Sequence, residues 1–100
     1  MGQRALKVHP SAVAEIRAAR LLYAEHSTET AERFFAEVEE GLERIAQLPE
    51  TWPFYLHGTR RFLLRRFPFS IVYRVMDDTI GIYALAHAKR RPGYWKARRL

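Results

Sequence analysis

The sequence has no cysteine among its 100 residues. This absence excludes disulfides, cysteine zinc sites and thiol nucleophiles. No apolar stretch approaches the roughly 20 residues that span a bilayer, and the N-terminus has no apolar run typical of a signal peptide. We therefore expect a cytoplasmic protein that makes no use of a membrane.

Metal motifs and phosphate loops are also missing. The four histidines, His9, His26, His57 and His87, are scattered, and no His, Asp or Glu spacing in the chain matches a metal-binding motif. No glycine-rich stretch is present to cradle a phosphate. The sequence therefore predicts no metal and no cofactor.

What is present is apolar content and positive charge. Hydrophobic residues make up 48% and charged residues 28%, which is typical of a folded domain. One hundred residues leave no room for a second core, so we expect a single domain over residues 1–100.

The charge is divided unevenly along the chain. Residues 1–50 carry six cations and nine glutamates, a net charge of 6 − 9 = −3, and residues 51–100 carry eleven cations and two aspartates, a net charge of 11 − 2 = +9. Such asymmetry favours a polyanionic partner, either nucleic acid or an acidic protein segment. A basic surface that only aids solubility is the alternative.

The first half has helical periodicity. After a short strand over residues 4–8, Pro10 and Ser11 begin a helix, with Ser11 able to cap it and an apolar stripe along one face. Ser27 or Thr28 caps a second helix that ends before Pro49. The break between the helices is short, so we expect an antiparallel helical hairpin. The first stripe consists of Ala12, Ile16, Ala19 and Tyr23.

The second half has strand patterns, over residues 60–67, 70–76 and 79–87, followed by a short helical turn over 94–100. A two-residue turn at 77–78 fixes the pairing of the last two strands. This pairing sets Val72 opposite Tyr83 and places Arg74 and His87 on one face of the sheet. The other face is apolar and is expected to pack on the helices. The resulting class is α+β.

Specific motifs then resemble a known group of proteins. The chain has a helical hairpin ending in LPE, the stretch RRFLLRRFPFSIVYRV, an acidic turn and the stretch IGIYALAHAKRRPGYW. Together they resemble the RelE/ParE superfamily of type II toxins. The resemblance implies a β-α-α-β-β-β order, with a helical hairpin packed on a small antiparallel sheet and a short C-terminal helix. It also implies a cognate antitoxin that forms a hetero-oligomer with the toxin.

The superfamily has two activities. RelE-like members cut mRNA at the ribosome without a metal, and ParE-like members poison DNA gyrase and cut nothing. Metal-free cleavage needs a proton-transfer group and a cation for the phosphorane charge. For that chemistry the resemblance points to His87 or Tyr94 for proton transfer and to Arg74 and Arg65 for the phosphate. The cations expected to bind nucleic acid or antitoxin are Arg60, Arg61, Arg66, Lys89, Arg90 and Arg91.

Three functions follow. A ribosome-dependent mRNA endonuclease is the leading hypothesis, a gyrase inhibitor without catalysis is the second, and a non-toxic basic interaction module is the third. The lysine pair of some nuclease members is replaced here by Arg60 and Arg61, and arginine is a poor general base. His87 also has a purely structural interpretation, as a strand-end side chain that hydrogen-bonds the C-terminal backbone.

Overall fold

The computed structural model describes residues 4–100 as one strand, two helices and three further strands. This order confirms the α+β class and the predicted succession of elements. A single 3-10 turn, η1, precedes the last three strands. The elements are β1 (Ala5–Val8), α1 (Pro10–His26), α2 (Thr28–Gln47), η1 (Leu56–Gly58), β2 (Arg60–Leu63), β3 (Phe69–Val75) and β4 (Thr79–His87).

The four strands form one sheet in the order β1-β4-β3-β2. β2, β3 and β4 pair antiparallel, whereas β1 pairs parallel with β4. The sheet is therefore mixed: the antiparallel pairing that the resemblance implied holds for β2, β3 and β4, and β1 adds a parallel edge. Parallel neighbours need a long connection, and here the helical hairpin together with β2 and β3 lies between β1 and β4 in the chain.

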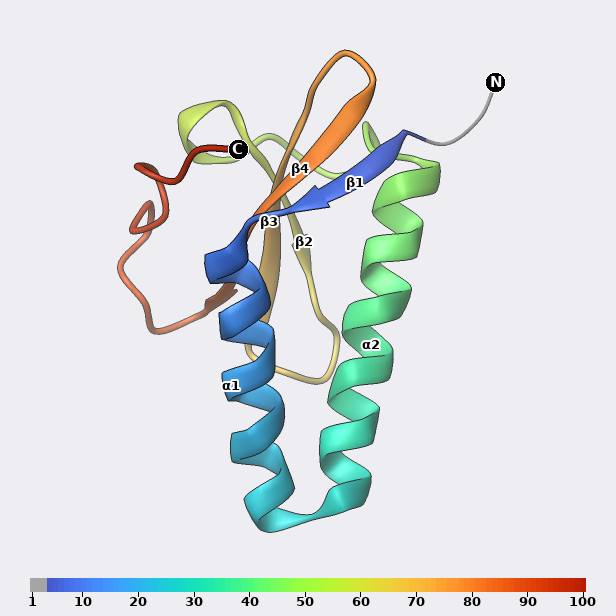
Figure 1. Ribbon diagram of the computed structural model, residues 1–100, viewed down its shortest axis with the longest axis vertical. Helices are drawn as coiled ribbons and strands as arrows, with labels where there is room; N and C mark the ends of the chain where they lie inside the picture. The colour runs from blue at the N-terminus through green and yellow to red at the C-terminus, as the bar shows by residue number, and fades with distance from the viewer. Residues whose placement is uncertain (1–3) are drawn as a thin grey trace.

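The helical hairpin covers one face of the sheet (Figure 1). The predicted stripe of α1 faces the core: Ala12 and Ala19 are buried, and Ile16 and Tyr23 pack against the buried cluster. Tyr23 is surrounded by other aromatic rings, with its ring centroid 5.2 Å from that of Phe34. The helical spacing of the apolar residues thus predicted the buried face correctly.

Local capping differs in one place from the expectation. Ser27 caps α2 as predicted, because its hydroxyl accepts a hydrogen bond from the Thr30 amide at 3.0 Å. At α1, however, the cap is His9, whose Nδ1 accepts from the Ser11 amide at 3.0 Å. Pro10 still occupies the first helical position, where its missing amide proton costs nothing.

α2 approaches the sheet closely at Gly41. A Cβ built on Gly41 would lie 2.9 Å from Cε1 of Phe62 and 3.0 Å from Cδ1 of Ile71. Glycine is therefore required here by space, which explains a residue that lowers helix propensity by about 1 kcal/mol relative to alanine.

Within residues 4–100, neither this helix nor α1 is long and apolar enough to cross a membrane.

The C-terminal segment, residues 88–100, is not helical. The short helix predicted over 94–100 is replaced by successive turns, with backbone bonds from Lys96 to Gly93 and from Arg98 to Trp95. Side-chain anchoring explains the difference, because Trp95 is only 2% exposed and packs on Val72 and Ala84 of the sheet. The C-terminal segment thereby covers the sheet face that points away from the helices, called the outer face below.

Candidate functional site

A β-bulge divides the site that the sequence predicts. The expected pairing of β3 with β4 holds from Val75 to Tyr73, but Val72 then pairs with Ala84 rather than with Tyr83. A bulge adds one residue to one strand and so reverses the alternation of side chains beyond it. The predicted pairing is therefore wrong for the second half of β4.

The bulge separates Arg74 from His87. Beyond it, Leu85 joins the core on the helix side, and the His87 ring packs edge-on against Phe69 with 4.9 Å between ring centroids. The Nδ1 atom of His87 accepts the Lys89 amide at 3.0 Å. Arg74 lies on the outer face, so the prediction that Arg74 and His87 share a face is wrong.

Arg74 is held in place by two contacts on the outer face. Its guanidinium donates to the carbonyl of His57 in η1 and lies over the Tyr83 ring, 5.3 Å from the ring centroid. Gly58 follows His57 with a positive φ of 74°, and the Arg74 guanidinium passes 3.8 Å from where a Gly58 Cβ would lie. η1 therefore orients the arginine.

Tyr94 is bound to an acid that the sequence did not single out as functional. Its hydroxyl donates to Glu15 of α1 at 2.6 Å, and Arg98 makes a bidentate pair with the same carboxylate at 2.8 and 2.9 Å. The Leu85 amide also donates to Glu15, at 3.1 Å. The C-terminal segment is thus tied to α1 through one carboxylate.

Electrostatics at Glu15 keep the carboxylate ionised. Burial disfavours its charge, but the hydrogen bonds of Arg98 and Tyr94 and the Arg98 charge outweigh that and lower the pKa of Glu15. The same environment raises the pKa of Tyr94, through burial first and then through its bond to Glu15. Tyr94 therefore keeps its proton, which stays directed at Glu15.

The two arginines of β2, Arg60 and Arg61, lie apart from each other. Arg60 donates to the carbonyl of Trp52 at 2.6 Å and covers Phe54. Arg61 points to the outer face and lies over Tyr55, 4.1 Å from the ring centroid. Phe54 is 74% exposed, so the stacked Arg60–Phe54 pair lies at the surface.

Arg65 and Arg66 lie on the helix side of the molecule, next to α2. β2 ends at Leu63 rather than continuing to residue 67, and the amides of both arginines then bond to one oxygen of Glu37. The chain turns back toward β3 at this point, and the Leu64 amide donates to the Phe69 carbonyl at 2.9 Å; Pro68 lies within the turn, where no ladder amide is needed. Arg65 therefore lies beside α2, whereas Arg74 lies on the outer face, and the two do not meet around one phosphate as their predicted roles require.

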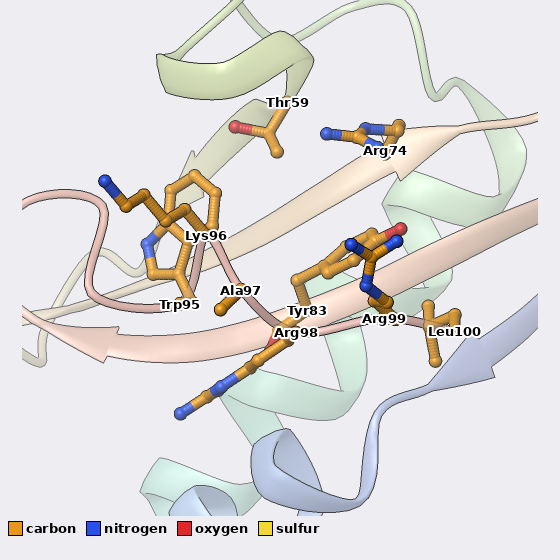
Figure 2. Close-up of a pocket in the computed structure, with 9 residues that line it drawn as sticks. All are labelled: Thr59, Arg74, Tyr83, Trp95, Lys96, Ala97, Arg98, Arg99 and Leu100. Atoms are coloured by element: carbon orange, nitrogen blue, oxygen red, sulfur yellow. The ribbon is translucent and has the colours of Figure 1, made fainter.

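The remaining predicted cations belong to the C-terminal segment. Arg90 stacks on the Tyr94 ring at 3.7 Å from its centroid, while Lys89 and Arg91 are exposed. Within residues 4–100 no group of three His, Asp or Glu side chains is placed to hold a metal ion. The outer face can bind anions, because the charged side chains that line its pocket are arginines and a lysine (Figure 2).

Comparison with known proteins agrees with this geometry. A helical hairpin on one face of a small mixed sheet, with a basic outer face, defines a protein of the RelE/ParE superfamily. Residues 6–92 match the family model of the ParE toxin of type II toxin-antitoxin systems, parDE. The chain therefore belongs to the ParE toxin family.

Solved structures support the fold. Nine chains match significantly. A chain of the chromosomal ParDE toxin-antitoxin system from P. aeruginosa is similar with a TM-score of 0.64 and 24% sequence identity, over 87% of this chain and 98% of that one. A search of curated proteins finds no significant match.

Proposed function

We propose that this protein is a growth-arresting toxin that acts by binding DNA gyrase and is neutralised by a cognate antitoxin. Membership of the ParE family supports the toxin class. The gyrase target is the one that the resemblance implies for ParE-like members. The observation that carries the choice is the separation of Arg74 from His87 across the bulge in β4.

Proton transfer to or from a reacting group needs hydrogen-bond reach, about 3 Å. Arg74 lines a pocket whose other described residues include no His, Asp or Glu. The Tyr94 hydroxyl donates a hydrogen bond to Glu15. The raised pKa of Tyr94 makes this hydroxyl a weak acid at neutral pH. An arginine with no histidine or carboxylate beside it in this pocket favours binding over cleavage.

A ribosome-dependent mRNA endonuclease is the competing hypothesis, with His87, Arg74, Arg65 and Tyr94 in the roles given above. It requires these groups to meet around one phosphate. In the described structure Arg65 lies beside Glu37 of α2 and Arg74 lies on the outer face. This distribution supports the gyrase proposal.

The test is induced expression in growing bacteria, with radiolabelled methionine and thymidine uptake followed in parallel. We expect thymidine incorporation to fall first, growth to recover when the antitoxin is co-expressed, and His87→Ala to remain as toxic as the parent. The His87 ring packs on Phe69 and accepts the Lys89 amide on the helix side of the sheet, so its loss leaves the outer face intact. A prompt loss of methionine incorporation that His87→Ala abolishes would overturn the proposal.

A further inference from the structure

The helix α1 exposes an apolar side, in contrast to α2. Most of the exposed residues of α2 are charged, whereas those of α1 are mainly alanine and leucine. Leu21 and Leu22 are 68% and 61% exposed. A helix that is apolar on both its buried and its outward side is typical of one that is covered all round, so the exposed side of α1 fits a contact with another protein surface. Its exposed apolar residues include Ala14, Ala18, Leu21, Leu22 and Ala24.

This side of α1 lies toward the free end of the helical hairpin. The end at which α1 turns into α2 projects beyond the sheet, whereas the C-terminal segment lies over the sheet (Figure 1). A hollow of about 390 Å³ lies between the two helices there, with Leu21, Ala24 and Ala31 among its lining residues. The hollow offers a recess for an apolar side chain, and a partner bound here leaves the outer face uncovered.

Two opposite charges are placed symmetrically about Leu21. Arg17, Leu21 and Glu25 follow one another at intervals of four residues, so they form one ridge along the exposed side of α1. Arg17 and Glu25 are separated by about 12 Å along the helix axis, which is too far for them to pair with each other. Neither of them belongs to an ion pair formed within residues 4–100.

A ridge of this kind is complementary to a second copy of itself. In a two-fold contact, each residue of one subunit that meets a given residue of the other is matched by the reverse contact. Two α1 helices that cross antiparallel at Leu21 therefore bring each Arg17 opposite Glu25 of the second copy, with the two leucines in contact on the axis. We propose that two copies of this chain associate through the exposed side of α1, with Leu21 at the centre and an Arg17–Glu25 pair on either side.

The local balance of charge favours a second copy over a polyanionic partner. The chain as a whole carries a net charge of +6, which opposes association of two copies through most of their surface. Around Leu21, however, the exposed cations Arg17 and Arg20 are balanced by the exposed acids Glu25 and Glu32. This balance removes the local repulsion, and complementary charges fix the register of a contact.

The test is sedimentation equilibrium of the purified full chain between about 1 and about 100 µM at constant ionic strength. We expect the mean mass to rise with concentration from the 11.8 kDa of one chain towards twice that value. Leu21→Gln is expected to raise the dissociation constant about tenfold or more, because it removes the apolar contact at the axis from both copies. The matched control is Leu63→Gln, at a leucine of β2 that is 60% exposed, and we expect it to change the dissociation constant by less than about threefold.

Exchanging the two charges tests the register of the contact. Arg17→Glu and Glu25→Arg each set like charges opposite one another at both ends, so we expect either change alone to raise the dissociation constant about tenfold or more. The two changes together restore opposite charges, so we expect a dissociation constant within about threefold of the parent value. Circular dichroism checks that each variant, altered at an exposed position, keeps its fold.

Net charge separates this specific effect from diffuse repulsion. It moves in opposite directions in the two single variants, to 6 − 2 = +4 for Arg17→Glu and to 6 + 2 = +8 for Glu25→Arg, so diffuse repulsion does not weaken both. Lys89→Glu, at an exposed position of the C-terminal segment, is the control with the same change of charge as Arg17→Glu. We expect it to change the dissociation constant by less than about threefold.

A parent chain that stays monomeric up to about 100 µM would overturn the proposal. Single charge variants that act in opposite directions, or a dimer that Leu21→Gln leaves intact, would overturn it as well. A monomeric chain whose Leu21→Gln variant no longer inhibits gyrase would assign the exposed side of α1 to a different protein. The sedimentation measurement uses neither gyrase nor growing cells, so its failure is distinguishable from failure of the growth-arrest test.

Discussion

Glu15 connects the most distant parts of the chain. Its carboxylate accepts from Tyr94, Arg98 and the Leu85 amide, and its side chain is 17% exposed. The sequence pattern placed Glu15 outside the apolar stripe of α1 and gave no reason to pair it with a residue 83 positions away. Only the folded arrangement of α1 against the C-terminal segment reveals this interaction.

We expect Glu15→Gln to lower the free energy of unfolding by about 2 kcal/mol near neutral pH, because Arg98 then loses its charged partner. The pKa of Glu15 is lowered below its usual 4.5. Its stabilisation is therefore complete above that value and is lost as the pH falls through the folded-state pKa. The difference between parent and variant is expected to shrink accordingly in urea unfolding measured from pH 7 down to about pH 3.

Glu25→Gln is the matched control, since Glu25 is an exposed residue of the same helix. We expect this change to alter stability by less than about 0.5 kcal/mol at every pH, at protein concentrations low enough for the chain to be monomeric. An equal loss for both variants, or a Glu15→Gln deficit that persists undiminished in acid, would contradict the account of Glu15.

At the scale of elements, the spacing of apolar residues along the chain predicted the two helices and the succession of strands correctly, whereas the predicted pairing of β3 with β4 was only half right. The stripe of α1, the cap at Ser27 and the bounds of β4 follow from local spacing and are confirmed. The bulge at Tyr83 depends on how two strands fit across the sheet, which a two-residue turn does not determine. That one extra residue moved His87 to the helix side, away from Arg74.

The contact of α2 with the sheet gives a test of packing. We expect Gly41→Ala to destabilise the protein by about 1 kcal/mol or more, although alanine favours helix by about that amount. The reason is the close approach of Phe62 and Ile71 to the position of a Cβ. Chemical denaturation followed by circular dichroism measures the change.

Ala36→Gly on the exposed side of the same helix supplies the comparison. Nothing packs tightly enough there to oppose propensity, so we expect a loss of about 1 kcal/mol from propensity alone. If Gly41→Ala instead stabilises the protein by the corresponding amount, the helix and the sheet have room to spare and the packing argument fails.

At the scale of the whole molecule, charge and fold coincide. The helical half is acidic and the strand half basic in the sequence, and the fold places the hairpin on one face of the sheet and the basic C-terminal segment on the other (Figure 1). The charge asymmetry, the order of elements and the superfamily were all accessible from the sequence. The convergence of Arg74 with Arg99 at the pocket of the outer face (Figure 2) was not, because it needs the C-terminal segment to fold back over the sheet.

The central claim is that the protein acts by binding a target and not by cutting RNA. The most direct measurement presents the purified chain to both targets, to DNA gyrase in a supercoiling assay and to ribosomes loaded with mRNA. We predict loss of supercoiling at toxin concentrations that leave the mRNA intact, with His87→Ala behaving as the parent. Cleaved mRNA with undisturbed supercoiling would contradict the account.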